Sequence, residues 1–163
     1  MRAYKHIGRK KSIELQSIFP SLSLSDLHDD DSILKYPISF WDKWYGEVEE
    51  KEEELNFDCD RNEELRRYNI LYGLASDIVN EYEVFGIFGN GYRVKAVRSK
   101  EQLLLDLEHH NFKMRPILIP SLCAIYYVTW DFTAFIYSAS EKGAAPLLEL
   151  AQNRGLKSIS SGT

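Results

Sequence analysis

The chain has few cysteines and no long apolar run. Its two cysteines, Cys59 and Cys123, lie 64 residues apart in a chain of 163 residues, one among carboxylates and one in an apolar stretch. This favours two free thiols in a reducing compartment over a disulfide framework. No stretch reaches the roughly 18 apolar residues of a transmembrane helix, and the basic N-terminus lacks the apolar core of a signal peptide. We therefore expect a cytoplasmic protein that has no membrane partner.

Signatures of catalysis and of cofactor binding are also missing. The sequence contains no G-x-S-x-G elbow, no H-E-x-x-H pair and no Walker loop. Residues 58–62 begin like a calcium loop, but Glu63 stands where the loop needs glycine and Asn69 where it needs a bidentate glutamate. The glycines at 86, 89 and 91 precede a strand-like run instead of a helix, which fits a hairpin better than a dinucleotide loop. We expect no enzymatic activity, no catalytic residues, no metal and no cofactor.

Apolar residues are plentiful enough for a single packed domain over residues 1–163. They make up 44% of the chain, and aromatic residues make up 13%. Residues 1–80 are expected to be mainly helical, with the strongest helix from Glu63 to about Asn80 and Asn62 as its N-cap. Another helix is expected to begin near Phe40, where aromatic side chains recur at helical spacing.

Strands and helices alternate in residues 82–160. Two hairpins are expected, one of which turns at Gly89-Asn90-Gly91, and each is followed by a helix. Ser99 opens the first of these helices in a capping box, and Gly155 ends the second. The expected strands are Tyr82–Phe88, Tyr92–Arg98, Leu122–Thr129, Phe132–Ser138 and Leu156–Ser160. This pattern predicts an α+β fold with a mostly antiparallel sheet in ββα-ββα-β order and helices on one face.

The most distinctive feature is a concentration of acid. Residues 47–64 hold ten carboxylates and two basic side chains, which gives this segment a formal charge of −8. The whole chain carries −5, so the remaining residues together carry +3. Such a segment attracts cationic proteins and accelerates their association, although it also fits a solvated helix extension that only aids solubility. The acidic residues that we predict to bind a partner are Glu47, Glu49, Glu50, Glu52, Glu53, Glu54, Asp58 and Asp60.

Aromatic residues supply a second set of candidate contacts. Trp130 and Asp131 stand in the predicted turn of the second hairpin, where a tryptophan is difficult to bury, so we expect an exposed partner anchor there. The cluster Phe40, Trp41, Trp44 and Tyr45 could also anchor a partner, although its helical spacing is typical of a core. We do not expect nucleic-acid binding, because clustered lysines and arginines occur only in the N-terminal arm.

The layout resembles an immunity protein of a contact-dependent growth inhibition or related polymorphic toxin system. The resemblance lies in PISFWDKWY, the acidic run after it, IYYVTWDFTAFIY and the closing NRGLKSI. It implies a cytoplasmic, stoichiometric inhibitor that binds the C-terminal domain of a cognate toxin, often a basic nuclease, and blocks its active site or substrate surface. It carries over no catalytic residue.

Two other interpretations stay open at this point. One is a small-molecule-binding domain or small enzyme with a pocket between the sheet and the helices. The other is a general interaction module, with an oligomeric state that the sequence does not define. Saturable stabilisation by a small molecule would favour the first, and concentration-dependent sizing would favour the second.

Overall fold

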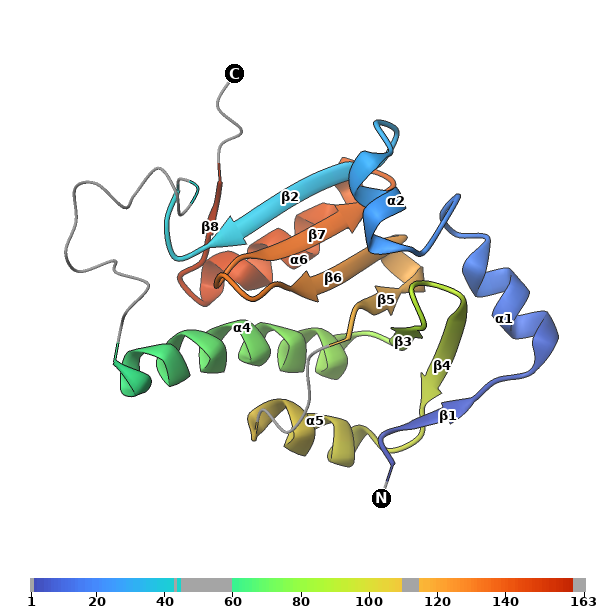
Figure 1. Cartoon of the computed structure of the whole chain (residues 1–163), viewed down its shortest axis with the longest axis horizontal. Coiled ribbons are helices and arrows are strands. Elements are labelled where there is room, and N and C mark those ends of the chain that lie inside the picture. The colour runs from blue at the N-terminus through green and yellow to red at the C-terminus, as the bar shows by residue number, and fades with distance from the viewer. Residues whose placement is uncertain (1, 43, 45–59, 110–114, 160–163) are drawn as a thin grey trace.

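A computed structural model describes residues 2–42, 44, 60–109 and 115–159. Within them, one eight-stranded sheet runs through the molecule in the order β1-β4-β3-β5-β6-β7-β2-β8 (Figure 1). All neighbouring strands are antiparallel. The strands are β1 (Tyr4–His6), β2 (Leu34–Ser39), β3 (Phe85–Phe88), β4 (Arg93–Val97), β5 (Ile117–Ile119), β6 (Ala124–Val128), β7 (Ala134–Ser138) and β8 (Lys157–Ser158).

Five α-helices and one short 3-10 helix accompany the sheet in the described part of the chain. They are α1 (Arg9–Gln16), α2 (Leu24–Asp29), α4 (Arg61–Glu81), α5 (Lys100–Glu108), the 3-10 helix η2 (Pro120–Leu122) and α6 (Glu141–Asn153). The long helix α4 crosses below the sheet in the view of Figure 1, and its first turn projects at one end of the molecule.

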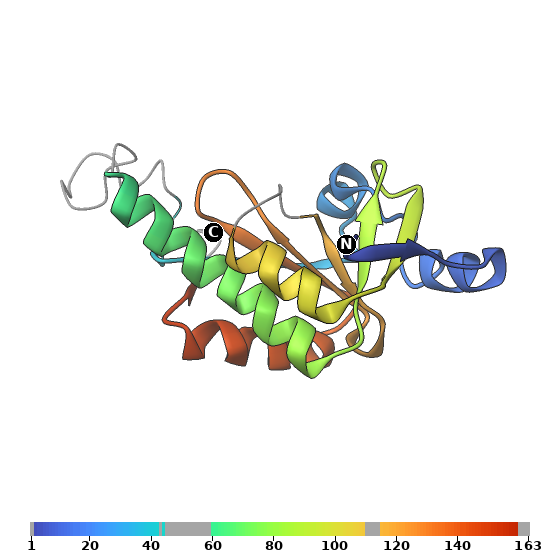
Figure 2. The same ribbon diagram turned by 90° about the horizontal axis from the view of Figure 1, so that it is seen from below.

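Helices α4, α5 and α6 cover one face of the sheet (Figure 2). Leu74 of α4, Leu103 of α5 and Leu147 of α6 are fully buried and pack with Ile119 and Ile136 of the sheet. Burying a leucine or isoleucine side chain contributes roughly 1.5–3 kcal/mol. This core therefore fixes α4 against the sheet along much of its length.

Helices α1 and α2 contribute to a second core on the opposite face. Leu15 of α1 and Leu27 of α2 pack in this core with Ile125 of β6. The neighbours of Ile125 in β6, Ala124 and Tyr126, lie in the first core, because successive side chains of a strand point to opposite faces. Helices therefore cover both faces, and the prediction that they pack on one face is wrong.

Local signals in the sequence define several element boundaries. The Ser99 hydroxyl accepts a hydrogen bond from the N–H three residues on, at 3.1 Å, which confirms the predicted N-cap of α5. Gly155 has a φ of +79° just after α6, as a C-terminal glycine does. The N-cap of α4 is Asp60, whose carboxylate accepts from the Glu63 N–H at 2.9 Å. The prediction of Asn62 as this cap is therefore wrong.

The α+β class and the antiparallel sheet are confirmed, but the details of the first half are not. Strand β1 pairs with β4, and β2 pairs with β7 and β8, so residues 1–80 contain two sheet strands besides their helices. The short strand β5 is also absent from the predicted order. Residues 40–42 form a bend instead of a helix start, and most of the helix expected there lies outside the described residues.

The buried hydroxyl of Tyr126 provides a test of the packing of α4 on the sheet. It donates to the Leu71 carbonyl oxygen of α4 at 2.9 Å. We expect Tyr126→Phe to lower the free energy of unfolding by about 1 kcal/mol and the Tm by about 2–4 °C. The control is Tyr92→Phe, because Tyr92 is 82% exposed. Urea and thermal denaturation measure the stability of both variants. Equal losses of stability in the two would contradict a buried hydrogen bond between Tyr126 and α4.

Candidate protein-binding surface

The predicted binding residues that the structure describes gather near the start of α4. Asp60 caps α4, and Trp130 and Asp131 lie in the turn between β6 and β7. The Tyr68 hydroxyl donates to the Trp130 carbonyl oxygen at 3.3 Å. Tyr68 is about 12 Å along the helix from Asp60, so the cap and the turn lie at the same end of the molecule.

We call this region the α4 surface and define it by Asp60, Glu63, Glu64, Tyr68, Trp130 and Asp131. The other predicted acidic contacts lie outside the described residues: Glu47, Glu49, Glu50, Glu52, Glu53, Glu54 and Asp58. They precede Asp60 directly in the sequence, so the chain enters the α4 surface from the acidic run.

The β6–β7 turn holds Trp130 in an exposed position. The Trp130 side chain is 76% exposed, as the sequence predicted for this turn. The Asp131 carboxylate accepts from the Thr133 N–H at 3.2 Å, and the Thr129 hydroxyl contacts the same carboxylate. The Thr129 N–H also donates to the Thr133 carbonyl oxygen at 2.8 Å. These hydrogen bonds hold in place the backbone of the turn that carries the exposed indole.

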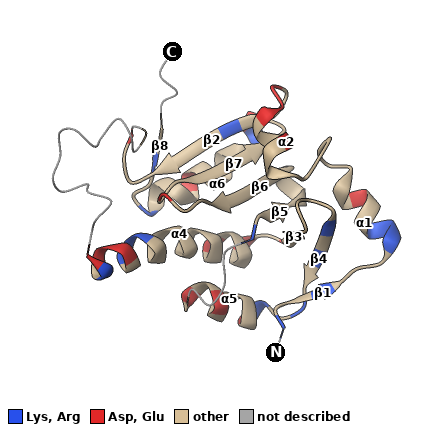
Figure 3. Cartoon of the chain, in the orientation of Figure 1, with Lys and Arg blue, Asp and Glu red and all other residues tan. Residues whose placement is uncertain are grey.

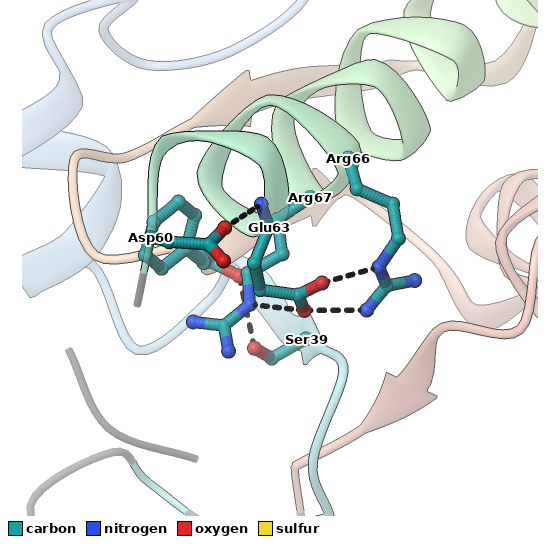
Figure 4. A network of polar contacts seen from close by, with 6 residues as sticks. Ser39, Asp60, Glu63, Arg66 and Arg67 are labelled. Atoms are coloured by element: carbon teal, nitrogen blue, oxygen red, sulfur yellow. Dashed lines mark hydrogen bonds and ion pairs between the residues drawn. The ribbon is translucent and has the colours of Figure 1, made fainter. Parts of the chain in front are cut away.

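The next residue, Phe132, has a left-handed backbone conformation with a φ of +58°. This conformation costs a residue with a side chain roughly 1–2 kcal/mol. Burial compensates for it, because the Phe132 ring is 3% exposed and lies 5.0 Å from the Tyr68 ring. The Phe132 carbonyl oxygen also accepts from the Ser39 hydroxyl at 2.9 Å (Figure 4). Strained residues persist where their surroundings hold them, often at functional sites.

A buried guanidinium lies beneath the α4 surface. Arg67 is 2% exposed, and its Cζ lies 5.1 Å from the Trp41 ring centroid and 5.0 Å from that of Phe132. Its Nε donates to the Glu63 carboxylate at 3.0 Å. Its Nη1 is shielded from solvent and has no acceptor among the described residues. Arg67 thereby joins α4, the chain after β2 and the β6–β7 turn.

Glu63 links Arg67 to a second arginine at the surface. The Arg66 guanidinium donates to both oxygens of the Glu63 carboxylate at 2.7 Å (Figure 4). The hydrogen bonds from Arg66, with a further contribution from Arg67, lower the pKa of Glu63 to about 2. Glu63 is therefore an anion whose charge is largely offset within the chain.

Asp60 and Glu64 differ from Glu63 in this respect. Both are exposed, and neither forms an ion pair within the described ranges. They stand at the positive end of the α4 dipole, which stabilises carboxylates. Their charge remains available to a partner, whereas that of Glu63 does not.

Sequence reasoning missed the interior of this site. It treated Trp41 as either an anchor or a core residue, and the structure buries it to 7% exposure against Arg67. The four-residue spacing of Glu63 and Arg67 was the one local signal of their ion pair. No local signal indicates that Phe132 adopts a left-handed conformation, since this depends on contacts with β2 and α4.

The described residues offer no group of three or more His, Cys, Asp or Glu side chains that could hold a metal. None of the helices in these ranges has the length and apolar character needed to cross a membrane. Cys123 is a free, exposed thiol at the end of the 3-10 helix, with a φ of +45°, and does not lie inside a strand.

A groove lies at the other end of the molecule. Its volume is about 1320 Å³, and it lies between the β3–β4 hairpin and the segment that joins α1 to α2. Its lining residues include Ser21, Ser23, Arg93, Arg115 and Tyr127. A pocket between sheet and helices is the kind of site on which the small-molecule interpretation depends.

The Glu63–Arg67 pair predicts a pH-dependent contribution to stability. We expect Glu63→Gln to lower the free energy of unfolding by about 1 kcal/mol at pH 7, because Arg67 is buried although solvent partly screens Glu63. The folded pKa lies below the unfolded value of about 4.3, so the contribution is complete above that value. It is lost as the pH falls toward 2, and the difference from wild type should disappear there.

The matched control is Glu64→Gln, which removes an exposed charge without an ion pair. Glu64→Gln should lower the free energy of unfolding by less than Glu63→Gln does. This smaller difference should vary with pH only as much as expected for a charge at the end of a helix. Urea denaturation between pH 2 and 7 measures both variants. A Glu63→Gln effect that persists unchanged at pH 2 would contradict the proposed ion pair.

Similarity to other proteins adds no further constraint on this surface. Comparisons of the chain with protein-family models, with curated proteins and with solved structures found no match. What the α4 surface can bind therefore follows from its own geometry: an exposed indole on a fixed turn, at the same end of the molecule as two exposed carboxylates that form no ion pair within the described residues.

Proposed function

We propose that this chain is an immunity protein that binds and neutralises a cognate toxin domain of basic character, such as a nuclease. The contact would be made by the α4 surface together with the acidic run that precedes it. The observation that carries the proposal is the exposed Trp130 indole on a turn that Tyr68 ties to α4, at the same end of the molecule as the exposed carboxylates of Asp60 and Glu64. Inhibition by stoichiometric binding needs no catalytic group in this chain.

The shape of the β6–β7 turn supports a role in binding. Tryptophan is among the residues that contribute most to protein interfaces, provided that its ring enters a pocket on the partner. The turn is held by Asp131 and by the Tyr68 hydroxyl, so little conformational freedom of the backbone is lost on binding. A 76% exposed indole on such a base has a large apolar surface to bury.

The distribution of charge supports a basic partner. Residues 47–64 carry a formal charge of −8, and Asp60 and Glu64 extend this charge onto the folded helix. Concentrated negative charge raises the association rate of a cationic protein, and salt reduces the effect. A nuclease domain has a cationic surface for its phosphate backbone substrate, and an acidic protein that covers this surface would exclude the substrate.

Capture of the toxin tests the proposal directly. The chain is co-expressed with the toxin domain encoded beside its gene, and growth, complex formation and stoichiometry are recorded. We expect restored growth and a stoichiometric complex that salt weakens. Undiminished toxicity at a confirmed excess of the folded chain would overturn the proposal.

The association and dissociation rates of that complex separate the contribution of the Trp130 side chain from electrostatic attraction by the acidic run. We expect Trp130→Ala to raise the Kd about thirtyfold or more, mainly through faster dissociation, because removing a central tryptophan costs about 2 kcal/mol or more. Charge reversal of Glu49, Glu50, Glu53 and Glu54 should slow association at low salt and flatten its salt dependence. Surface plasmon resonance measures both rates.

A matched control keeps this test independent of folding. Tyr92→Ala removes an exposed aromatic ring at the other end of the molecule and should leave both rates unchanged. Thermal denaturation confirms that each variant is folded. If Trp130→Ala binds with wild-type rates, the β6–β7 turn is not the anchor.

A further inference from the structure

The β3–β4 hairpin presents basic side chains on one face of the sheet. Arg93 of β4 lies directly opposite Phe88 of β3. Two residues further along β4, Lys95 lies opposite Gly86. Residues that are opposite each other on neighbouring strands, or two apart on one strand, share a face of the sheet. The Arg93 and Lys95 side chains therefore lie on the same side as the Phe88 ring.

A third cation, Arg115, reaches this side from the segment before β5. The Arg115 Cζ and the Lys95 Nζ each lie 4.5 Å from the centroid of the Phe88 ring. The groove lies on the opposite side, because it is lined by Ile87, the neighbour of Phe88 in β3. The groove therefore takes no part in this surface. We call the surface the cationic face and define it by Phe88, Arg93, Lys95 and Arg115.

Two aromatic rings support the cations from below. The Tyr4 ring of β1 meets the Phe88 ring edge to face, with the centroids 5.3 Å apart. A Cβ on Gly86 would lie 2.7 Å from the Tyr4 Cε1 and 2.8 Å from the Phe88 Cε2. The two rings therefore occupy the space that a side chain at this position would take. This packing fixes the ring on which Lys95 and Arg115 lie.

The positive charges on this face are close together and lack ion-pair partners. Lys95 and Arg115 are separated by at most twice their distance to the ring centroid, so they repel each other. The Phe88 ring attracts both cations but carries no net charge that could neutralise them. In the described part of the chain, neither these two residues nor Arg93 form an ion pair.

One carboxylate acts on the same region, that of Asp106 in α5. Burial raises the pKa of Tyr4 to about 12; Arg115 opposes this increase and Asp106 adds to it. Asp106 forms no ion pair with a cation of the described residues. The three cations of the face therefore outnumber the carboxylate that acts on its supporting ring.

The positive charge extends beyond the cationic face. Residues outside 47–64 carry a formal charge of +3, and α1, which follows β1, begins with Arg9, Lys10 and Lys11. Figure 3 shows lysines and arginines on β1, β4 and α1, at the end of the molecule away from the start of α4. The sequence shows clustered cations only in the N-terminal arm, whereas the pairing of β1 with β4 adds those of the hairpin. This combination is the reason to reconsider nucleic-acid binding.

We propose that the cationic face binds the phosphate backbone of a nucleic acid without reading its base sequence. Arg93 and Arg115 would hold phosphate oxygens, because guanidiniums bind them in bidentate fashion, and Lys95 would contribute a point charge. Clustered lysines and arginines that neutralise phosphates supply most of the affinity of sequence-independent binding. The proposal goes beyond the immunity function and concerns the opposite end of the molecule from the α4 surface.

The composition of the face favours a nucleic acid over an acidic protein. Protein interfaces depend on aromatic anchors that enter a pocket on the partner. The Phe88 ring already carries two cations, and the Tyr4 ring is half-buried against it. A phosphate backbone needs no such anchor. Arg93 and Lys95 are roughly 7 Å apart along β4, which is about the rise of two nucleotides in a duplex strand, so one backbone can contact both.

Fluorescence anisotropy of the full chain with a labelled oligothymidylate, and with a mixed-sequence strand of the same length, tests the proposal. We expect saturable binding at low salt, with Kd values that agree within about twofold. Three phosphate contacts on a single strand predict that log Kd rises with log salt at a slope of about 2. Arg93→Gln and Arg115→Gln should each raise the Kd about tenfold and lower this slope by about 0.7.

The matched control is Arg61→Gln, which removes an exposed guanidinium from the other end of the molecule. It changes the net charge by the same amount, so it separates the cationic face from the overall charge of the chain. We expect it to change the Kd less than twofold and to leave the salt slope unchanged. Thermal denaturation verifies that each variant is folded.

Competition with polyglutamate of equal charge identifies the class of polyanion. If polyglutamate displaces the strand as well as unlabelled oligothymidylate does, the face binds acidic proteins and the proposal is wrong. No saturable binding, or an equal rise in Kd for Arg61→Gln and Arg93→Gln, would also overturn it. Toxin capture stays unaffected if only this proposal fails.

Discussion

The burial of the Arg67 guanidinium is the constraint on which the α4 surface depends. A charge removed from water costs several kcal/mol unless partners compensate for it. Here the Trp41 and Phe132 rings lie on the guanidinium, and Glu63 supplies the carboxylate. These three partners come from the chain after β2, from the β6–β7 turn and from α4. The contacts of the one buried guanidinium therefore hold three segments of the chain together. The exposed Trp130 and the strained Phe132 owe their positions to this arrangement.

The fold also separates two kinds of surface. The α4 surface has the exposed indole of the β6–β7 turn and, at the helix start, two exposed carboxylates that form no ion pair within the described residues. In the sequence it directly follows the acidic run. The far end of the sheet has cations around the Phe88 ring on one face, and a groove lined by Ile87 and Tyr127 on the other. Because the sheet and α4 lie between these ends (Figure 1), a protein bound at one end would leave the other accessible.

Much of the second half could be predicted from the sequence, because its signals are local. Gly89-Asn90-Gly91, the Ser99 cap and Gly155 act within a few residues, and each defines the boundary that it predicts. Helix α4 follows from its apolar periodicity alone. The exposure of Trp130 follows from the scarcity of apolar cover in a tight turn.

The remainder depends on contacts between distant parts of the chain. Strand β1 has only three residues and acquires its identity by pairing with β4, which lies some ninety positions later. Strand β5 is equally short and is stabilised by β3 and β6 on either side. The role of Arg67 requires Trp41 and Phe132 to meet around it, and the cation–π contacts of Phe88 require Lys95 of β4 and Arg115 before β5 to meet at its ring. No pattern within a single element encodes such encounters.

Hydrogen–deuterium exchange of the chain, free and bound to the basic toxin domain that we propose as its partner, would test the central claim most directly. The account predicts protection on binding in the first turns of α4 and in the β6–β7 turn, with little change in the β3–β4 hairpin and β1. Protection confined to the hairpin and β1, with unchanged exchange at the start of α4, would contradict the assignment of the binding surface.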